Sequence, residues 1–123
     1  MTQQPFIVVI DGDRSMCKAL TRLLNTAQMG VETYSSCDEF LLSIDHRKPD
    51  CLVLDSQMPG ITGTALRDRL AGMGRSVPVV FTTAANGVDV THRATGFEVL
   101  HKPFDDKLLL EAIGRAIQGR EAK

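Results

Sequence analysis

The sequence predicts a doubly wound α/β fold, in which helices cover both faces of a parallel five-stranded sheet. Short apolar runs alternate with segments whose apolar residues recur at helical spacing, and this alternation is typical of βα units. Connections between parallel strands are right-handed, so the direction in which the chain moves along the sheet determines which face each helix covers. The expected strands are Phe6–Ile10, Val31–Tyr34, Cys51–Leu54, Val79–Thr82 and Glu98–Leu100.

The first two helices are expected directly after the first two strands. Arg14–Met29 carries leucines and other apolar residues on one helical face, and Gly30 is expected to end this helix. Ser36 and Glu39 form the pattern of a capping box, in which each side chain accepts a backbone N–H at the start of a helix. A second helix is therefore predicted from Ser36 onward.

The second half of the chain contains two clear helical patterns and one weak one. A helix is expected from about Thr64 to the glycines at 72 and 74, and Asp105 is expected to cap the last helix. Asn86–Gly96 has few apolar residues and includes threonines of low helix propensity. We therefore expect a short or disordered fourth helix there.

Length and composition indicate one globular domain over residues 1–123, with a core at about 5–118. The chain is 43% hydrophobic and 24% charged, and its 14 basic and 15 acidic residues give a net charge of −1. This balance argues against direct nucleic-acid binding. No apolar run is long enough for a membrane helix, and the first residues do not resemble a signal peptide. A cytoplasmic location is expected.

Four polar residues lie where apolar runs end: Asp11, Asp55, Thr83 and Lys102. In open α/β sheets the ligand crevice lies outside the carboxyl ends of the strands, so these side chains are expected to converge there. Two carboxylates, a hydroxyl and an ammonium suit a cation or a phosphoryl group. Asp55 is the best candidate nucleophile, because it follows a fully apolar strand.

Each of the other polar residues has a chemical role that this arrangement allows. Lys102 precedes Pro103, which keeps it out of helical geometry and leaves its ammonium to pair with a carboxylate or a phosphoryl oxygen. Thr83 can donate its hydroxyl to the same oxygen. Asp11 can bind Mg²⁺, which proteins hold with one or two carboxylates together with phosphate oxygens. Asp13 is expected to cap the first helix, with metal binding as the alternative.

Four motifs resemble the receiver domain of two-component response regulators: VVIDGD at 8–13, LVLDSQMPGITG at 52–63, FTTA at 81–84 and HKPFDD at 101–106. The resemblance covers nearly the whole chain. It implies the flavodoxin-like receiver fold with sheet order 2-1-3-4-5. It also implies that Asp55 is a phosphoacceptor, which receives its phosphoryl group from a histidine kinase or a phosphotransfer protein. It also implies Mg²⁺ bound by Asp11, Asp55 and the backbone carbonyl of Gln57, with Thr83 and Lys102 binding the phosphoryl group. A receiver of this kind is a switch and not a turnover enzyme.

Three departures from the family pattern bear on function. Gly12 stands where the family has a second acid, which predicts weak Mg²⁺ binding. Val99 stands where an aromatic residue is common, and the segment between Thr83 and Lys102 is shorter than usual. These departures favour an alternative, in which a degenerate receiver acts as an interaction module without phosphorylation.

A more remote alternative is a phosphatase. Asp11 and Asp13 resemble the nucleophile and acid/base pair of haloacid-dehalogenase-type phosphatases. The sequence does not identify the kinase or the signal. It is compatible with a fused output domain and with a homodimer. The last helix resembles that of receivers attached to helix-turn-helix output domains.

Overall fold

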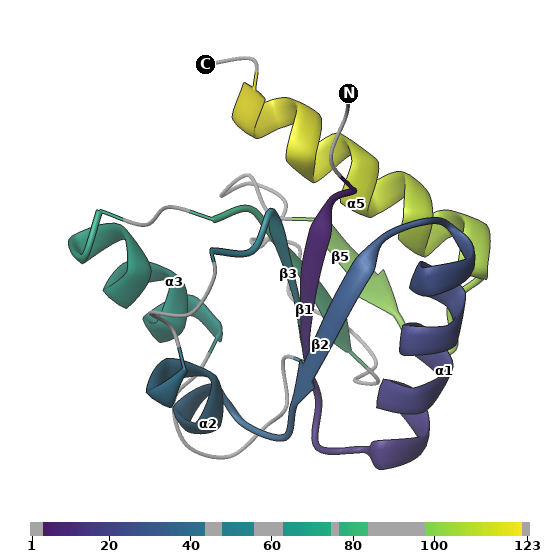
Figure 1. Ribbon diagram of the computed structural model, residues 1–123, viewed down its shortest axis with the longest axis horizontal. Coiled ribbons are helices and arrows are strands. Elements are labelled where there is room, and N and C mark those ends of the chain that lie inside the picture. Colours follow the sequence, from purple (N-terminus) through teal and green to yellow (C-terminus); the bar gives the residue numbers. More distant parts are fainter. Residues whose placement is uncertain (1–3, 44–47, 56–62, 75–76, 84–97, 122–123) are drawn as a thin grey trace.

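The structure is a computed structural model that describes residues 4–43, 48–55, 63–74, 77–83 and 98–121. Within these ranges the chain forms a parallel five-stranded sheet of order β2-β1-β3-β4-β5, as predicted (Figure 1). The strands are β1 Phe6–Ile10, β2 Gly30–Tyr34, β3 Cys51–Asp55, β4 Val79–Thr83 and β5 Glu98–His101. The fourth helix predicted at 86–96 lies outside the described residues.

The helices cover both faces of the sheet, which confirms the doubly wound architecture (Figure 1). One face carries α1 (Arg14–Thr26) and α5 (Asp106–Glu121), and the other carries α2 (Cys37–Leu42) and α3 (Gly63–Gly72). No helix in the described part of the chain is both long and apolar enough to cross a membrane.

The core consists of two apolar clusters, one on each face of the sheet. Alternate residues of the central strands supply the two clusters, because successive side chains of a strand point to opposite faces. Phe40 of α2 and Phe81 of β4 are the largest fully buried side chains on one face, and Leu24 and Ile113 are fully buried on the other. These clusters fix the central strands, and therefore the positions of the residues at their carboxyl ends.

The end of α1 differs from the prediction. The helix ends at Thr26, not Met29, and Gly30 begins β2 and does not end the helix. Gln28 adopts the left-handed conformation, with φ 65°. Its N–H donates to Asn25 O at 3.0 Å, and the N–H of Met29 donates to Leu24 O at 2.9 Å. This is the Schellman pattern, here formed with glutamine where glycine is usual.

Two large apolar residues near helix ends are half-exposed. Met73 lies one residue beyond α3 with half of its surface exposed, because the chain turns at Gly74, which has φ 76°. Leu108 lies in the first turn of α5 and is also half-exposed. The helix starts are as predicted: Ser36 accepts the N–H of Glu39, and Asp105 accepts the N–H of Lys107.

Candidate functional site

Four of the predicted site residues, Asp11, Asp55, Thr83 and Lys102, lie at the carboxyl end of the sheet. Asp55 and Thr83 are the last residues of β3 and β4, one residue further into the strands than predicted. Asp11 follows β1 directly, and Lys102 follows β5. The parallel register sets their level, since Ile10 pairs with Leu54 and Asp55 pairs with Thr82. The topology thus brings residues from distant parts of the sequence to one edge.

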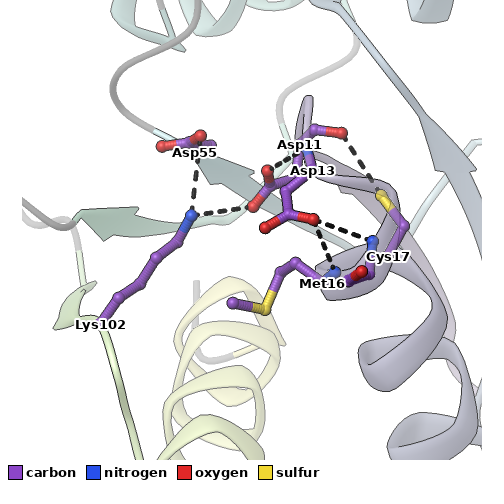
Figure 2. A network of polar contacts seen from close by, with 7 residues as sticks. Asp11, Asp13, Met16, Cys17, Asp55 and Lys102 are labelled. Atoms are coloured by element: carbon purple, nitrogen blue, oxygen red, sulfur yellow. Dashed lines mark hydrogen bonds and ion pairs between the residues drawn. The ribbon is translucent and has the colours of Figure 1, made fainter.

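The ammonium of Lys102 lies between two carboxylates (Figure 2). Lys102 Nζ is 3.0 Å from Asp11 Oδ2 and 3.6 Å from Asp55 Oδ2. The side chains of Lys102, Asp11 and Asp55 are only 17%, 4% and 15% exposed. Charges removed from water interact strongly, because little solvent screens them. The three residues therefore form one electrostatic unit that carries one more negative than positive charge.

Asp11 is held by contacts on its side chain and on its backbone. Its Oδ1 accepts the N–H of Asp13 at 2.9 Å, and its own N–H donates to Tyr34 O at 3.1 Å. The thiol of Cys17 donates to Asp11 O at 3.3 Å. The pKa of the Cys17 thiol is raised, first by burial and then by the nearby charges of Asp11 and Asp13. The loop after β1 thus fixes the Asp11 carboxylate in position.

Asp13 caps α1. Its Oδ1 accepts the N–H of Ser15 at 2.9 Å and that of Met16 at 3.3 Å, and its backbone is extended, as at a helix N-cap (Figure 2). The predicted capping role is therefore confirmed. Both backbone donors use Oδ1 of Asp13, and metal binding by this residue stays a prediction.

Thr83 reaches the site edge as part of β4. It is buried, and its backbone carbonyl accepts the N–H of Lys102 at 2.7 Å. This bond ties the end of β4 to the lysine that pairs with both carboxylates. The sequence pattern did not predict it. Gln57, whose carbonyl was expected to bind Mg²⁺, lies outside the described residues.

The side chains present fit a divalent cation only in part. Asp11 and Asp55 provide two carboxylates near one another, and carboxylate oxygen is the ligand that Mg²⁺ prefers. Gly12 adds no third one, and the described residues contain no group of three or more His, Cys, Asp or Glu that could hold a metal. Among the described residues, no atom lies within 4 Å of a Cβ atom placed at Gly12. The loop therefore has room for the acid that the sequence lacks.

The fold and the site define the class of the protein as a doubly wound α/β domain with a lysine between two carboxylates at one edge of its sheet. Residues 7–114 match the family described as the response regulator receiver domain. The chain belongs to this family and is a receiver domain of the two-component response regulator type. This membership supports the receiver interpretation over the phosphatase resemblance of Asp11 and Asp13.

Relatives and solved structures agree with this assignment. The chain is 32% identical to nodulation protein W of Bradyrhizobium diazoefficiens, over 91% of the chain and 51% of that protein. It is also 32% identical to the transcriptional regulatory protein FixJ of the same organism, over 98% of the chain and 60% of that protein. A response regulator receiver protein from Burkholderia phymatum superposes with a TM-score of 0.81 at 40% identity, covering 94% of this chain and 96% of that one. The chain spans about half the length of the curated relatives it matches.

Proposed function

We propose that this receiver is a phosphoacceptor switch whose Asp55 takes a phosphoryl group from a histidine kinase or a phosphotransfer protein. The observation that carries the proposal is the position of the Lys102 ammonium, between the carboxylates of Asp11 and Asp55. Asp55 ends a buried strand, so its carboxylate has a fixed position at the sheet edge. Phosphoryl transfer requires mainly such positioning, together with neutralisation of charge.

The transfer uses an oxygen of the Asp55 carboxylate as the nucleophile. This oxygen attacks the phosphorus of a phosphohistidine, the new P–O bond forms as the P–N bond breaks, and the leaving imidazole keeps the electron pair and takes up a proton. Lys102 can move its ammonium from Asp55 to an oxygen of the arriving phosphoryl group, since the 3.6 Å pair is the looser of its two contacts. Thr83 is the proposed hydroxyl donor to another oxygen.

Mg²⁺ is the proposed cofactor, and Asp11 and Asp55 are the residues that would hold it, with the Gln57 carbonyl as a third ligand. When bound, Mg²⁺ supplies positive charge that offsets the oxygens of the phosphoryl group. Two carboxylates, one of them paired with Lys102 at 3.0 Å, make a weaker cation site than three would. We therefore propose that Mg²⁺ binds this receiver weakly.

The proposal is tested by locating the phosphoryl group after incubation with acetyl phosphate and Mg²⁺. Peptide mass mapping is expected to find it on Asp55, and the Asp55→Asn variant is expected to remain unlabelled. Asp13→Asn serves as the matched control and should label like the wild type, since asparagine can also cap a helix. Label on Asp11, or label retained in Asp55→Asn, would overturn the assignment.

A second function is favoured by Gly12. Without the second acid, the domain can act as an interaction module that does not require phosphorylation. A receiver that never labels, yet labels once Gly12→Asp restores the acid, would have this function.

The setting of the domain in the cell is also part of the proposal. Relatives described as transcriptional regulatory proteins are longer than this chain, and they suggest a partner or fused output domain that acts on transcription. Phosphorylation would then shift the receiver between two surface states, one of which the output domain prefers. A cytoplasmic location and a homodimer belong to the same proposal.

A further inference from the structure

A stripe of three cations runs along α1. Arg14, Lys18 and Arg22 are spaced four residues apart, so they lie on one face of the helix, and all three are exposed. Like charges at this spacing weaken a helix, and α1 contains no acidic residue that would offset them. None of the three forms an ion pair with another described residue. The stripe is therefore a feature that the stability of the helix does not explain.

Two of these cations line a hollow between α1 and β2. The hollow has a volume of about 420 Å³ and is lined by Cys17, Lys18, Thr21, Arg22 and Thr33. Figure 1 shows α1 beside β2, the strand at one edge of the sheet. No acidic side chain lines the hollow. Glu32 is the nearest acid along β2, and its carboxylate accepts the hydroxyl of Tyr34, which packs on the opposite face of the sheet.

The outer edge of β2 adds a second kind of binding group. The N–H of Gly30 donates to Pro5 O at 2.9 Å and the carbonyl of Tyr34 accepts from Asp11 N–H at 3.1 Å, so these residues point toward β1. Backbone groups of successive strand residues point in opposite directions. Val31 and Thr33 therefore direct their N–H and C=O groups outward, at the side of the sheet where no described strand pairs.

We propose that the hollow between α1 and β2 binds an extended acidic segment of a partner protein. The segment would continue the sheet by bonding to Val31 and Thr33, while its carboxylates would pair with Lys18 and Arg22. A nucleic acid fits less well, because a phosphate backbone cannot bond to both the N–H and the C=O groups of an edge strand. The net charge of −1 also gives the chain no general attraction for nucleic acid.

This surface adjoins the phosphorylation site without using its residues. Cys17 lines the hollow, and its thiol donates to the backbone carbonyl of Asp11. The proposal goes beyond phosphoacceptance, and binding here should be the same in the wild type and in Asp55→Asn. The two proposals can therefore fail separately.

The test measures peptide binding by fluorescence anisotropy at low salt. The probe is a labelled peptide of alternating Glu and Thr, about eight residues long, which is enough to span one edge strand. The comparison peptide replaces every Glu with Lys. The acidic peptide is expected to bind and to lose affinity as salt rises, and the basic one is not. Failure of the acidic peptide to bind, or equal binding of both peptides, would overturn the proposal.

Two charge-reversal variants test the location. Lys18→Glu with Arg22→Glu is expected to weaken acidic-peptide binding by at least about tenfold. Arg69→Glu with Lys107→Glu makes the same change in net charge at exposed positions on α3 and α5, and it should leave binding nearly unchanged. Equal losses in the two variants would show that only overall charge matters, which contradicts the proposal.

Amide hydrogen exchange followed by NMR tests the edge itself. Bound peptide is expected to protect the amides of Val31 and Thr33, while Thr33→Pro, which removes one outward N–H, should weaken binding. The exchange measurement in the wild type decides the question even if the proline variant fails to fold. Unprotected amides, or tighter binding of a short oligothymidylate than of the acidic peptide, would contradict the strand-addition geometry.

Discussion

An ion pair lies at each end of β5. The pair with the better hydrogen-bond geometry lies at the end away from the candidate site. Glu98, the first residue of β5, accepts two hydrogen bonds from the guanidinium of Arg115 in α5, at 3.0 and 3.1 Å. After the strand, Lys102 meets Asp11 at 3.0 Å and Asp55 at 3.6 Å. Arg115 and Glu98 are 55% and 34% exposed, whereas Asp11 is almost fully buried.

The difference shows that burial, more than the number of hydrogen bonds, determines how strongly the charges of an ion pair interact. Water screens the pair of Arg115 and Glu98, so it adds little to stability although its geometry is bidentate. Lys102 instead offsets two carboxylates that solvent reaches poorly. The exposed pair links α5 to β5 with little gain in stability, while at the buried end Lys102 stays close to two carboxylates.

Removing the cation at the buried end should have the largest effect on stability. In Lys102→Met, Asp11 and Asp55 lose their shared partner, and we expect the free energy of unfolding to fall by about 2 kcal/mol. Urea denaturation measures this change, with Lys107→Met as the control at an exposed position. A loss no larger than that of the control would mean that the two carboxylates do not depend on Lys102.

Adding a carboxylate at Gly12, next to Asp11, should strengthen metal binding. Gly12→Asp places a third acid where a new Cβ meets no atom of the described residues, and we expect the affinity for Mg²⁺ to rise about tenfold. A Mg²⁺ titration followed by NMR measures it. Gly72→Asp adds the same charge at another position with open space and should give no gain. Equal affinities for wild type and Gly12→Asp would refute the explanation of weak binding.

A smaller effect should separate capping from metal binding at Asp13. Asp13→Ala removes the acceptor for Ser15 and Met16, and we expect it to cost about 1 kcal/mol of stability. Asp13→Asn keeps the cap and should change neither thermal stability nor Mg²⁺ affinity by much. If Asp13→Asn weakened Mg²⁺ binding strongly, Asp13 would be a metal ligand after all.

The smallest effect is expected at the exposed end of β5. Arg115→Met should lower the free energy of unfolding by at most about 0.5 kcal/mol, because solvent already screens this pair. The loss should shrink further in high salt. Urea denaturation of Arg115→Met and Lys102→Met at two salt concentrations tests the comparison directly. A larger loss of unfolding free energy in Arg115→Met than in Lys102→Met would contradict the comparison.

The sequence predicted the centre of the sheet well because β1, β3 and β4 consist mainly of apolar residues in buried positions. The strands continue through Asp55 and Thr83 because pairing with their neighbours extends to these residues. The end of α1 was predicted wrongly, since glycine is the usual residue in the left-handed position and here Gln28 occupies it. Local patterns thus located the elements but not every boundary.

The site could be predicted from topology, while its detailed contacts could not. Asp11 and Lys102 are 91 positions apart, and only the sheet order brings them within bonding distance. The bond from Cys17 to Asp11 O has no sequence signal. The spacing of Arg14, Lys18 and Arg22 did carry a signal, but their place beside the edge of β2 required the structure.

The intact mass of the protein after incubation with acetyl phosphate, with and without Mg²⁺, tests most directly whether Asp55 is a phosphoacceptor. The wild type is expected to gain one phosphoryl group only when Mg²⁺ is present, and at a high Mg²⁺ concentration because Gly12 supplies no ligand. Asp55→Asn should gain none under any condition. A wild-type protein that gains no phosphoryl group even at high Mg²⁺, while Gly12→Asp does, would contradict the account and show that this receiver acts without phosphorylation.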